Sequence, residues 1–321
     1  MKKKRREILK YTRDKESFMT SKGLKNTFKR RKRKRRNKRI FKGVICIVAA
    51  VLIWYIGHGA SKIIFSSTLN NKEVQKVNYL DKIPEEVKNS QDPVIQSLLN
   101  KANNNPQVIT MLNDIKSYPK QLLELAAKKD EAIDFVANYP NSDTSTNKVI
   151  SIKKDYKKGE IPLFIQWDER WGYEKYGSDF IAINGCGPTS LAMVAVGLTG
   201  NTDINPRSVA DFSAKNGYLV EGVGSSWNLM TKGAANFGLK GKELPLSENA
   251  IITTLKKGQP IIASMGPGTF TTSGHFIVLT GVDSNNKIIV NDSDSKIKSK
   301  QTWDVGIFMK EAKNLWTFTT T

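Results

Sequence analysis

The stretch from Asn184 to Gly200 constrains the fold of this chain most. It reads Asn-Gly-Cys-Gly-Pro-Thr-Ser-Leu-Ala-Met-Val-Ala-Val-Gly-Leu-Thr-Gly, so small residues around Cys186 precede a mostly apolar run. A proline in the first turn, here Pro188, and a glycine just past the end are typical start and stop signals of a helix. The pattern therefore predicts a buried helix with Cys186 at or just before its first turn.

The position of Cys186 allows two interpretations. At the start of a helix, unpaired backbone N–H groups and the positive end of the helix dipole favour an anion. A thiolate is such an anion, so this placement is expected to make Cys186 nucleophilic. Free cysteine is also commonly buried for packing alone. The stretch by itself leaves both interpretations open.

The net charge of +21 is concentrated in the first 42 residues. These hold 21 lysines and arginines and three acidic residues, whereas the rest of the chain holds 30 and 27. The basic character therefore belongs to a cytoplasmic tail at 1–42 and not to the folded part. Beside a membrane, such a tail favours attraction to anionic lipid. No aromatic or fold signal accompanies the charge, so we expect no binding to nucleic acid.

An apolar segment follows the tail and, with its flanks, reaches the roughly 20 residues that a membrane-spanning helix needs. Trp54 and Tyr55 within it suit the membrane interface. Basic residues before the segment place the N-terminus in the cytoplasm and the rest of the chain outside the cell. The sequence thus predicts a single-pass transmembrane helix at 43–65. A cleavable signal peptide is the alternative, because the apolar core is short.

Composition divides the rest of the chain into three parts. A polar linker or stalk is expected at 66–92, a helical module at 93–140 and a C-terminal domain at 159–321. In the helical module, prolines separate short apolar stretches, which predicts three or four short helices. None of its residues forms a chemical motif, so we expect it to pack on the next domain or to act as a spacer.

The C-terminal domain mixes short apolar runs with many glycines. Its pattern predicts helices at 205–216, 225–237 and 247–257, strands at 260–265, 275–282 and 287–291, a strand or extended segment at 161–166, and an edge element at 303–318. This is an α+β fold.

His275 is the candidate general base of the C-terminal domain. The other histidine of the chain, His58, falls at the end of the predicted membrane span, and Cys46 falls within it. Cys186 therefore has no expected disulfide partner, and such an unpaired thiol is a candidate reactive residue. A nucleophilic cysteine needs a neighbouring base. Since His275 directly follows a glycine at the start of an apolar strand, the sequence predicts a Cys186–His275 pair.

A carboxylate is expected beside His275. The two strands that follow His275 are joined by a hairpin-type turn, Asp283-Ser-Asn-Asn. Folding about that turn sets His275 opposite positions near 292–294, where Asp292 and Asp294 share one face of the strand. A carboxylate there would orient the imidazole, as in a catalytic triad. Asp292 is our choice and Asp294 the alternate, while the capping of a turn is the remaining interpretation for both.

An amide side chain is the usual second donor to an oxyanion, beside the backbone N–H of the nucleophile. Gln166 lies twenty residues before Cys186 in a tryptophan-rich loop. It fits the chain order of papain-like enzymes, in which the amide, the nucleophile, the base and the orienting residue follow one another. A glutamine taken alone remains weak evidence.

Four motifs in this order carry a family resemblance. They are Ile161-Pro-Leu-Phe-Ile-Gln-Trp-Asp-Glu-Arg-Trp-Gly, Gly185-Cys-Gly-Pro-Thr-Ser-Leu-Ala-Met, Gly274-His-Phe-Ile-Val-Leu-Thr-Gly and Val290-Asn-Asp-Ser. Together they resemble the C39-like branch of papain-fold cysteine peptidases, which includes relatives of the domains that remove double-glycine leaders from exported peptides. The resemblance covers about 159–321.

The resemblance implies a papain-like cysteine peptidase domain. With the segments predicted from the sequence pattern, the expected architecture is this domain preceded by a small all-α module and a single transmembrane helix. The resemblance also implies Cys186 as nucleophile, His275 as base, Asp292 as orienting residue and Gln166 as oxyanion donor, with a peptide or protein as substrate. With the predicted topology, the chain is expected to be a membrane-anchored extracellular cysteine peptidase.

Two alternatives stay open for the function. The same chemistry could cleave the stem peptides of peptidoglycan, which would bring the chain into contact with the cell wall, or the domain could be a non-catalytic binding protein. We expect no cofactor and no metal, because the part after the predicted span offers one histidine and one cysteine, too few for a zinc site. Asp292 and Asp294 resemble only a fragment of a calcium loop.

Overall fold

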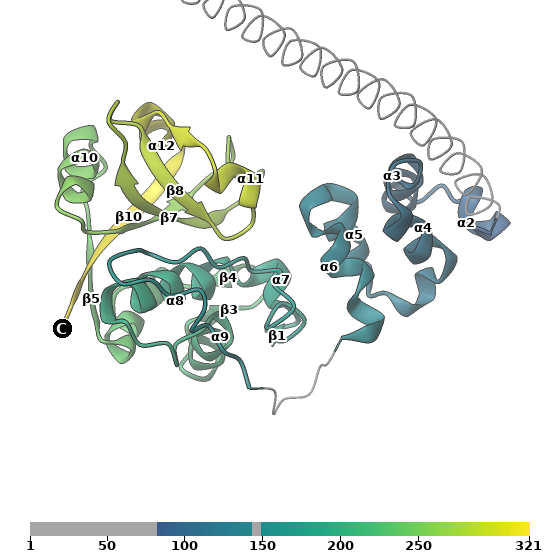
Figure 1. Ribbon diagram of the computed structural model, residues 1–321, viewed down its shortest axis with the longest axis horizontal. Coiled ribbons are helices and arrows are strands. Elements are labelled where there is room, and N and C mark those ends of the chain that lie inside the picture. Colours follow the sequence, from purple (N-terminus) through teal and green to yellow (C-terminus); the bar gives the residue numbers. More distant parts are fainter. Residues whose placement is uncertain (1–81, 143–148) are drawn as a thin grey trace, which may run out of the picture. The chain divides into compact units, whose positions relative to one another are not determined.

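The computed structural model describes residues 82–142 and 149–321 (Figure 1). The predicted basic tail at 1–42, the predicted transmembrane helix at 43–65 and most of the predicted stalk lie outside these residues. Within the described ranges, no helix is both long enough and apolar enough to cross a membrane. The expectations for the N-terminal region therefore stay predictions.

The helical module consists of short helices joined by tight turns. They are α2 (Glu85–Lys88), α3 (Pro93–Ala102), α4 (Pro106–Asn113), α5 (Lys120–Lys128) and α6 (Ile133–Ala137). α3 and α4 each begin with a proline that follows a capping side chain. The Asp92 carboxylate accepts from the N–H of Val94, and the Asn105 side chain accepts from the N–H of Gln107. These are the start signals that the sequence contains.

The helical module begins earlier than the predicted residue 93. Helix α2 lies within the range expected to be a stalk, and Ile83 and Val87 beside and within it are buried among the other module helices. Two apolar side chains in a polar stretch are too few to produce a periodic signal, which explains why the sequence pattern misses this helix.

The C-terminal domain combines helices with an antiparallel sheet, in agreement with the predicted α+β fold class. Its helices are α7 (Ile181–Asn184), α8 (Cys186–Thr199), α9 (Pro206–Lys215), α10 (Glu248–Lys256), α11 (Lys296–Ser299) and α12 (Val305–Glu311). Its larger sheet contains β5 (Leu239–Glu243), β6 (Ile261–Met265), β7 (His275–Val282), β8 (Ile288–Asp292), β9 (Thr302–Trp303) and β10 (Ala312–Thr320). Two short strand pairs, β1 (Lys175–Tyr176) with β2 (Asp179–Phe180) and β3 (Leu219–Val220) with β4 (Gly224–Ser225), complete it.

The strand order of the larger sheet is β5-β10-β6-β7-β8-β9. β10 lies inside this sheet, because Trp316 has Glu243 as its partner on one side and Ile262 on the other. The prediction of an edge element at 303–318 is therefore wrong for this strand. The prediction failed because β5 lies outside β10, and only one of the five β5 residues is buried, so no apolar alternation reveals it.

Two further segments differ from their predicted conformation. Residues 225–237 contain two 3-10 helices, η4 (Trp227–Met230) and η5 (Gly233–Phe237), in place of one α-helix. The break lies at Thr231, whose φ of −110° and ψ of −80° are not helical. The segment 161–166, predicted as a strand or extended segment, forms neither helix nor strand, and its last residue lies in a turn.

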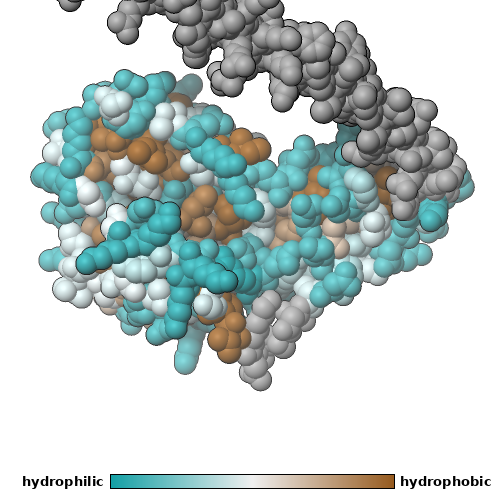
Figure 2. All heavy atoms as spheres, viewed as in Figure 1, coloured by the Kyte–Doolittle hydropathy of each residue, from teal (hydrophilic) through white to brown (hydrophobic). Residues whose placement is uncertain are grey.

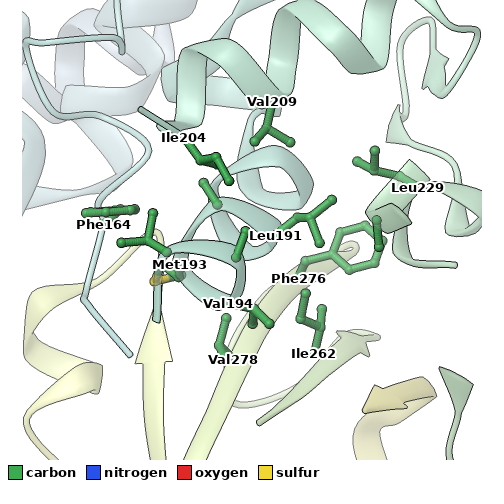
Figure 3. Packing of buried hydrophobic residues seen from close by; sticks show 14 of the residues in the cluster. Phe164, Leu191, Met193, Val194, Ile204, Val209, Leu229, Ile262, Phe276 and Val278 are labelled. Atoms are coloured by element: carbon green, nitrogen blue, oxygen red, sulfur yellow. The ribbon is translucent and has the colours of Figure 1, made fainter. Parts of the chain in front are cut away.

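Helix α8 is the centre of the C-terminal domain. It packs against α9 on one side and against β7 and β10 on the other, an arrangement visible in Figure 1. Figure 3 shows Leu191, Met193 and Val194 of α8 together with Val278 of β7. Residues 187–196 are buried without interruption, and the helix ends where Gly200 adopts a left-handed conformation with φ 71°. The start and end of this helix agree with the sequence prediction.

The buried side chains form three groups, which we name by their place. The central cluster surrounds α8, the module cluster fills the helical module, and the sheet cluster lies between the sheet and helices α10 and α12. Strand β7 serves two of them, because successive side chains point to opposite faces of a strand. Phe276 and Val278 join the central cluster, whereas Ile277 and Leu279 join the sheet cluster.

The surface visible in Figure 2 is mostly hydrophilic, with hydrophobic residues in small separate patches. The exposed large hydrophobic side chains come from different elements, among them Val223, Trp227 and Ile297. Scattered residues of this kind are normal on a folded domain and need no special explanation.

Candidate active site

Cys186 is the first residue of α8 and is partly buried against the central cluster. The glycines on either side of it are required by close packing. A Cβ on Gly185 would collide with the backbone oxygen of Ile181, and a Cβ on Gly187 would lie 2.5 Å from Oγ of Ser225. The Gly-Cys-Gly sequence therefore lets α7 and the β4 strand approach the start of α8 and hold the thiol at the helix N-terminus.

His275 and Asp292 form a buried hydrogen-bonded pair. Nε2 of His275 lies 2.7 Å from Oδ1 of Asp292, and the two residues are 8% and 1% exposed. His275 is the first residue of β7 and Asp292 the last of β8, where its strand partner is Ile277. The two side chains are thus diagonal neighbours on one face of the sheet, within the reach of long side chains.

The charges of this pair are set by opposing effects. Burial lowers the pKa of His275, but hydrogen bonds with Asp292 and Cys186 and their negative charges outweigh it and raise the pKa to about 10. Burial raises the pKa of Asp292, but the contacts with His275 and with the backbone N–H of Asp294 bring it below its ordinary value. At neutral pH the pair is an imidazolium and a carboxylate. Since Nε2 is bound to Asp292, Nδ1 is the ring nitrogen left for Cys186.

Gln166 is buried, and both its backbone N–H and its side-chain amide form hydrogen bonds. Its backbone N–H donates to the oxygen of Ser293 at 2.7 Å, and its Oε1 accepts from Oγ of Ser293 at 3.2 Å. Its Nε2 donates to the backbone oxygens of Ala182 at 2.9 Å and Ile183 at 3.3 Å. The amide nitrogen is therefore directed at the carbonyl groups just before α8, and the structure does not join it to Cys186 by a hydrogen bond.

Asp294, the alternate orienting residue, is bound elsewhere. Continuing the β7–β8 register would set residue 294 opposite His275, but β8 ends at Asp292. The Asp294 carboxylate instead pairs with Nζ of Lys129 at 2.8 Å. Burial, aided by the charge of Asp292, raises the pKa of Asp294 in spite of Lys129 and His275. The contact with the imidazole therefore belongs to Asp292.

Two serines hold the Asp292 segment and were not found from the sequence. Ser293 binds the side chain of Gln166, and Ser299 accepts from the backbone N–H of Asp292 at 2.9 Å. Serine is common in turns, so neither residue stands out by type. The run Asp-Ser-Asp-Ser at 292–295 was the one available signal, because four short polar side chains directly after an apolar strand are expected to bond to nearby backbone.

Tyr176 supports the start of α8 and was also missed. Its buried hydroxyl lies 2.6 Å from Oγ of Ser213 and 2.8 Å from Oγ of Ser225, the serine that contacts Gly187. Burial raises the pKa of Tyr176 more than its hydroxyl partners lower it, and the charge of Cys186 adds to the rise. The tyrosine therefore stays neutral beside the thiol. No sequence motif marks it.

Comparison with protein families gives a match to the Peptidase_C39 like family over residues 158–320. Among solved structures, the peptidase domain of Streptococcus ComA, a bifunctional ABC transporter involved in a quorum sensing pathway, is 20% identical with a TM-score of 0.34, over 43% of this chain and 93% of that domain. A double glycine motif protease from an AMS/PCAT transporter, in complex with a leader peptide, is 20% identical with a TM-score of 0.31, over 54% of this chain and 100% of that one.

No curated protein matches the chain. The family match begins one residue before Gly159, where the sequence pattern begins the C-terminal domain. It includes Gln166, Cys186, His275 and Asp292, so the residues singled out by their chemistry all lie within it.

Proposed function

Because the chain belongs to the Peptidase_C39 like family and is thus a cysteine peptidase, we propose that it hydrolyses peptide bonds with Cys186 as nucleophile and His275 as general base. Asp292 is the orienting carboxylate in this proposal. The observation that carries it is a single imidazole, that of His275, bound to Asp292 at 2.7 Å and electrostatically coupled to the Cys186 thiol at the start of α8. This is the arrangement of an activated nucleophile, its base and an orienting group.

In acylation, the Cys186 thiolate attacks the carbonyl carbon of the scissile peptide bond, and the electron pair of the C=O bond moves to oxygen. As the tetrahedral intermediate collapses, the C–N bond breaks and the His275 imidazolium gives its proton to the leaving amine. Because the contact with Asp292 keeps His275 protonated at neutral pH, this acid is present before the substrate arrives. The product is a thioester between the acyl group and Cys186.

In deacylation, neutral His275 takes a proton from a water molecule as the water oxygen attacks the thioester carbon. The C–S bond then breaks, the carboxylic acid product leaves, and the thiolate–imidazolium pair is restored. Asp292 stays ionised throughout. Its function is to hold the ring with Nε2 occupied, so that Nδ1 remains the nitrogen that exchanges the proton.

The developing oxyanion needs donors that are in place before the reaction. We assign this function to the backbone N–H of Cys186 at the helix start and to Nε2 of Gln166. Of the two carbonyl contacts of Nε2, the one to Ile183 is the longer at 3.3 Å. We expect the substrate to replace this weaker contact, because hydrogen bonds weaken with distance.

We also propose that the catalytic domain acts outside the cell, anchored by a transmembrane helix at 43–65 with the basic tail on anionic lipid. The support is the apolar segment directly after a basic run. In intact cells that express the full chain with Cys46→Ser, a membrane-impermeant maleimide should label Cys186. Labelling only after lysis would contradict this location, and release of the domain into the medium would favour the cleaved signal peptide.

The reaction is tested with the full chain and two substrates. Cys186 should be labelled by iodoacetamide, and hydrolysis of unstructured peptides should disappear in Cys186→Ser. If the serine variant retains the full rate, Cys186 is not the nucleophile. Purified cell wall serves as the second substrate, because release of stem-peptide fragments without any cleavage of free peptides would favour a peptidoglycan endopeptidase.

A further inference from the structure

One short segment, residues 292–295, connects the two sides of the candidate active site. Its first residue, Asp292, binds the imidazole of His275. Its second, Ser293, binds Gln166 twice, through the backbone oxygen at 2.7 Å and through the hydroxyl at 3.2 Å. A shift of this segment would therefore move the orienting carboxylate and the proposed oxyanion donor together.

The next two residues of the segment are bound to the helical module. Asp294 pairs with Nζ of Lys129 at 2.8 Å, and both side chains are largely withdrawn from solvent, at 28% and 20% exposed. Oγ of Ser295 donates to Oε1 of Glu131 at 2.6 Å, and the N–H of Ile297 donates to the other oxygen of the same carboxylate at 3.0 Å. Two charged groups of the module thus hold the segment directly after Asp292.

The module also supports the loop that carries Gln166. The residues on either side, Ile165 and Trp167, are buried in the module cluster, as is Ala182, whose oxygen accepts from Gln166. The same loop region also contacts the module through Tyr173, whose ring stacks on that of Phe135. The ring centroids are 4.2 Å apart, and the planes are 9° from parallel. Gln166 is therefore fixed between a core of module side chains and the segment 292–295.

From these contacts we infer that the helical module is a positioning part of the active site, with Lys129 and Glu131 as the positioning residues that fix the segment after Asp292. The inference rests on the proposed function, because it concerns the geometry of the same Cys186–His275–Asp292 group. The module thus has a function in catalysis, although none of its residues forms a chemical motif in the sequence.

The charge of Lys129 balances that of Asp294. Removing one partner of a largely buried ion pair leaves the other charge uncompensated, which is strongly unfavourable. Asp294 must then take up a proton or turn toward solvent. Either change disturbs its backbone N–H, which donates to Oδ1 of Asp292 at 2.8 Å. Asp292 would hold His275 less firmly, and the thiolate at Cys186 would lose part of its stabilisation.

The experiment compares two lysines of the module in the full chain. Lys129→Met removes the contact to Asp294. Lys101→Met removes an ion pair within the module, where Nζ lies 2.7 Å from Asp130. The two lysines are similarly exposed, at 20% and 23%, but Asp130 is 81% exposed, so its charge stays solvated when Lys101 is removed. The readout is the second-order rate of alkylation of Cys186 by iodoacetamide. We expect about a tenfold loss for Lys129→Met, in the range usual for coupled neighbours, and less than about a twofold loss for Lys101→Met.

Two further variants separate positioning from loss of folding. Lys129→Arg keeps the charge and should restore most of the alkylation rate. In the double variant Lys129→Met/Asp294→Asn no buried charge is left alone, so its rate should equal that of Asp294→Asn within about twofold. Two results would overturn the inference. One is an equal loss of alkylation rate in Lys129→Met and Lys101→Met. The other is a loss in the double variant that equals the product of the losses in Lys129→Met and Asp294→Asn.

The alkylation rate keeps this inference distinct from the proposed function, because it needs no peptide substrate. If Cys186→Ser retains the peptidase rate, the proposed function fails. If Cys186 is the nucleophile but the two lysine variants behave alike, the proposed function stands and the positioning function of the module is wrong.

Discussion

The two sides of the candidate active site are held in different ways. His275 and Asp292 stand at the ends of adjacent antiparallel strands, so their pairing follows from the register of β7 and β8 within one sheet. Gln166 lies on a loop without strand partners, between the module cluster and the segment 292–295. The strand register therefore brings His275 and Asp292 together, whereas the oxyanion side depends on packing between two parts of the chain, and both sides meet at the segment 292–295.

This difference predicts which changes should damage catalysis through chemistry and which through position. Loss of the nucleophile is the largest effect, because both sides of the site act on the reaction of the Cys186 thiol. Cys186→Ala should reduce peptide hydrolysis by at least about 10⁴-fold, as expected when a covalent step is eliminated. The rate is measured with unstructured peptides, and His275→Ala should give a loss of similar size because the two residues act as a unit. Residual activity near the wild-type rate would contradict the assignment.

Removal of the oxyanion donor is the next largest effect. Gln166→Ala should lower kcat by about 10²- to 10³-fold, the usual result of losing one donor to an oxyanion. Its effect on Cys186 alkylation should be small, because alkylation develops no oxyanion. If Gln166→Ala reduces alkylation as much as hydrolysis, Gln166 supports the fold of the site and is no oxyanion donor.

Asp292→Asn tests the base side and should be milder. An amide can still orient the imidazole, as the Cys-His-Asn arrangement of papain-like enzymes demonstrates, so we expect a loss of about tenfold or less. The hydrogen bond and charge of Asp292 are leading causes that raise the pKa of His275 to about 10, against burial, which lowers it. Without them the imidazolium is lost at lower pH.

The pH dependence provides the corresponding measurement. The alkaline limb of kcat/KM reports the acid form of His275 in the free enzyme. In the wild type it should lie well above the ordinary histidine pKa of about 6.5, and in Asp292→Asn it should move to lower pH. An alkaline limb that does not move would show that Asp292 does not hold the His275 proton. Lys101→Met serves as the control, because Lys101 is bound to Asp130 and Ala126 inside the helical module and contacts none of the proposed catalytic residues.

The smallest effect is expected at a contact between the helical module and the C-terminal domain that involves none of the proposed catalytic residues. The hydroxyl of Tyr173 donates to the backbone oxygen of Phe135 at 2.6 Å. Tyr173→Phe keeps the stacked ring and should lower the free energy of unfolding by about 1 kcal/mol, with more if the carbonyl stays unsatisfied. Peptide hydrolysis should change by less than about twofold, since this is the effect expected of a lone interface hydrogen bond. A large loss of activity without loss of stability would extend the positioning region to this contact.

The difference between local and long-range contacts also explains which parts of the site could be predicted from the sequence. Helix α8 has its start and stop signals within its own residues, and the His275–Asp292 contact needs only a hairpin and a strand period of two. Both were accessible from local pattern. The contacts of Lys129 and Glu131 join residues more than 160 positions apart and carry no periodic signal, so neither could be derived. Gln166 was identified from its place in the chain order, but its carbonyl partners depend on how α7 approaches the loop.

The most direct test of the account is the rate at which iodoacetamide alkylates Cys186 in the folded full chain across pH. The proposed catalytic group contains a thiolate–imidazolium pair, so alkylation should stay fast at neutral pH and fall sharply in His275→Ala, with Cys186 identified as the modified residue by mass spectrometry. If the rate at neutral pH is the same in wild type, in His275→Ala and in the unfolded chain, the imidazole does not activate the thiol and the proposed catalytic group is wrong.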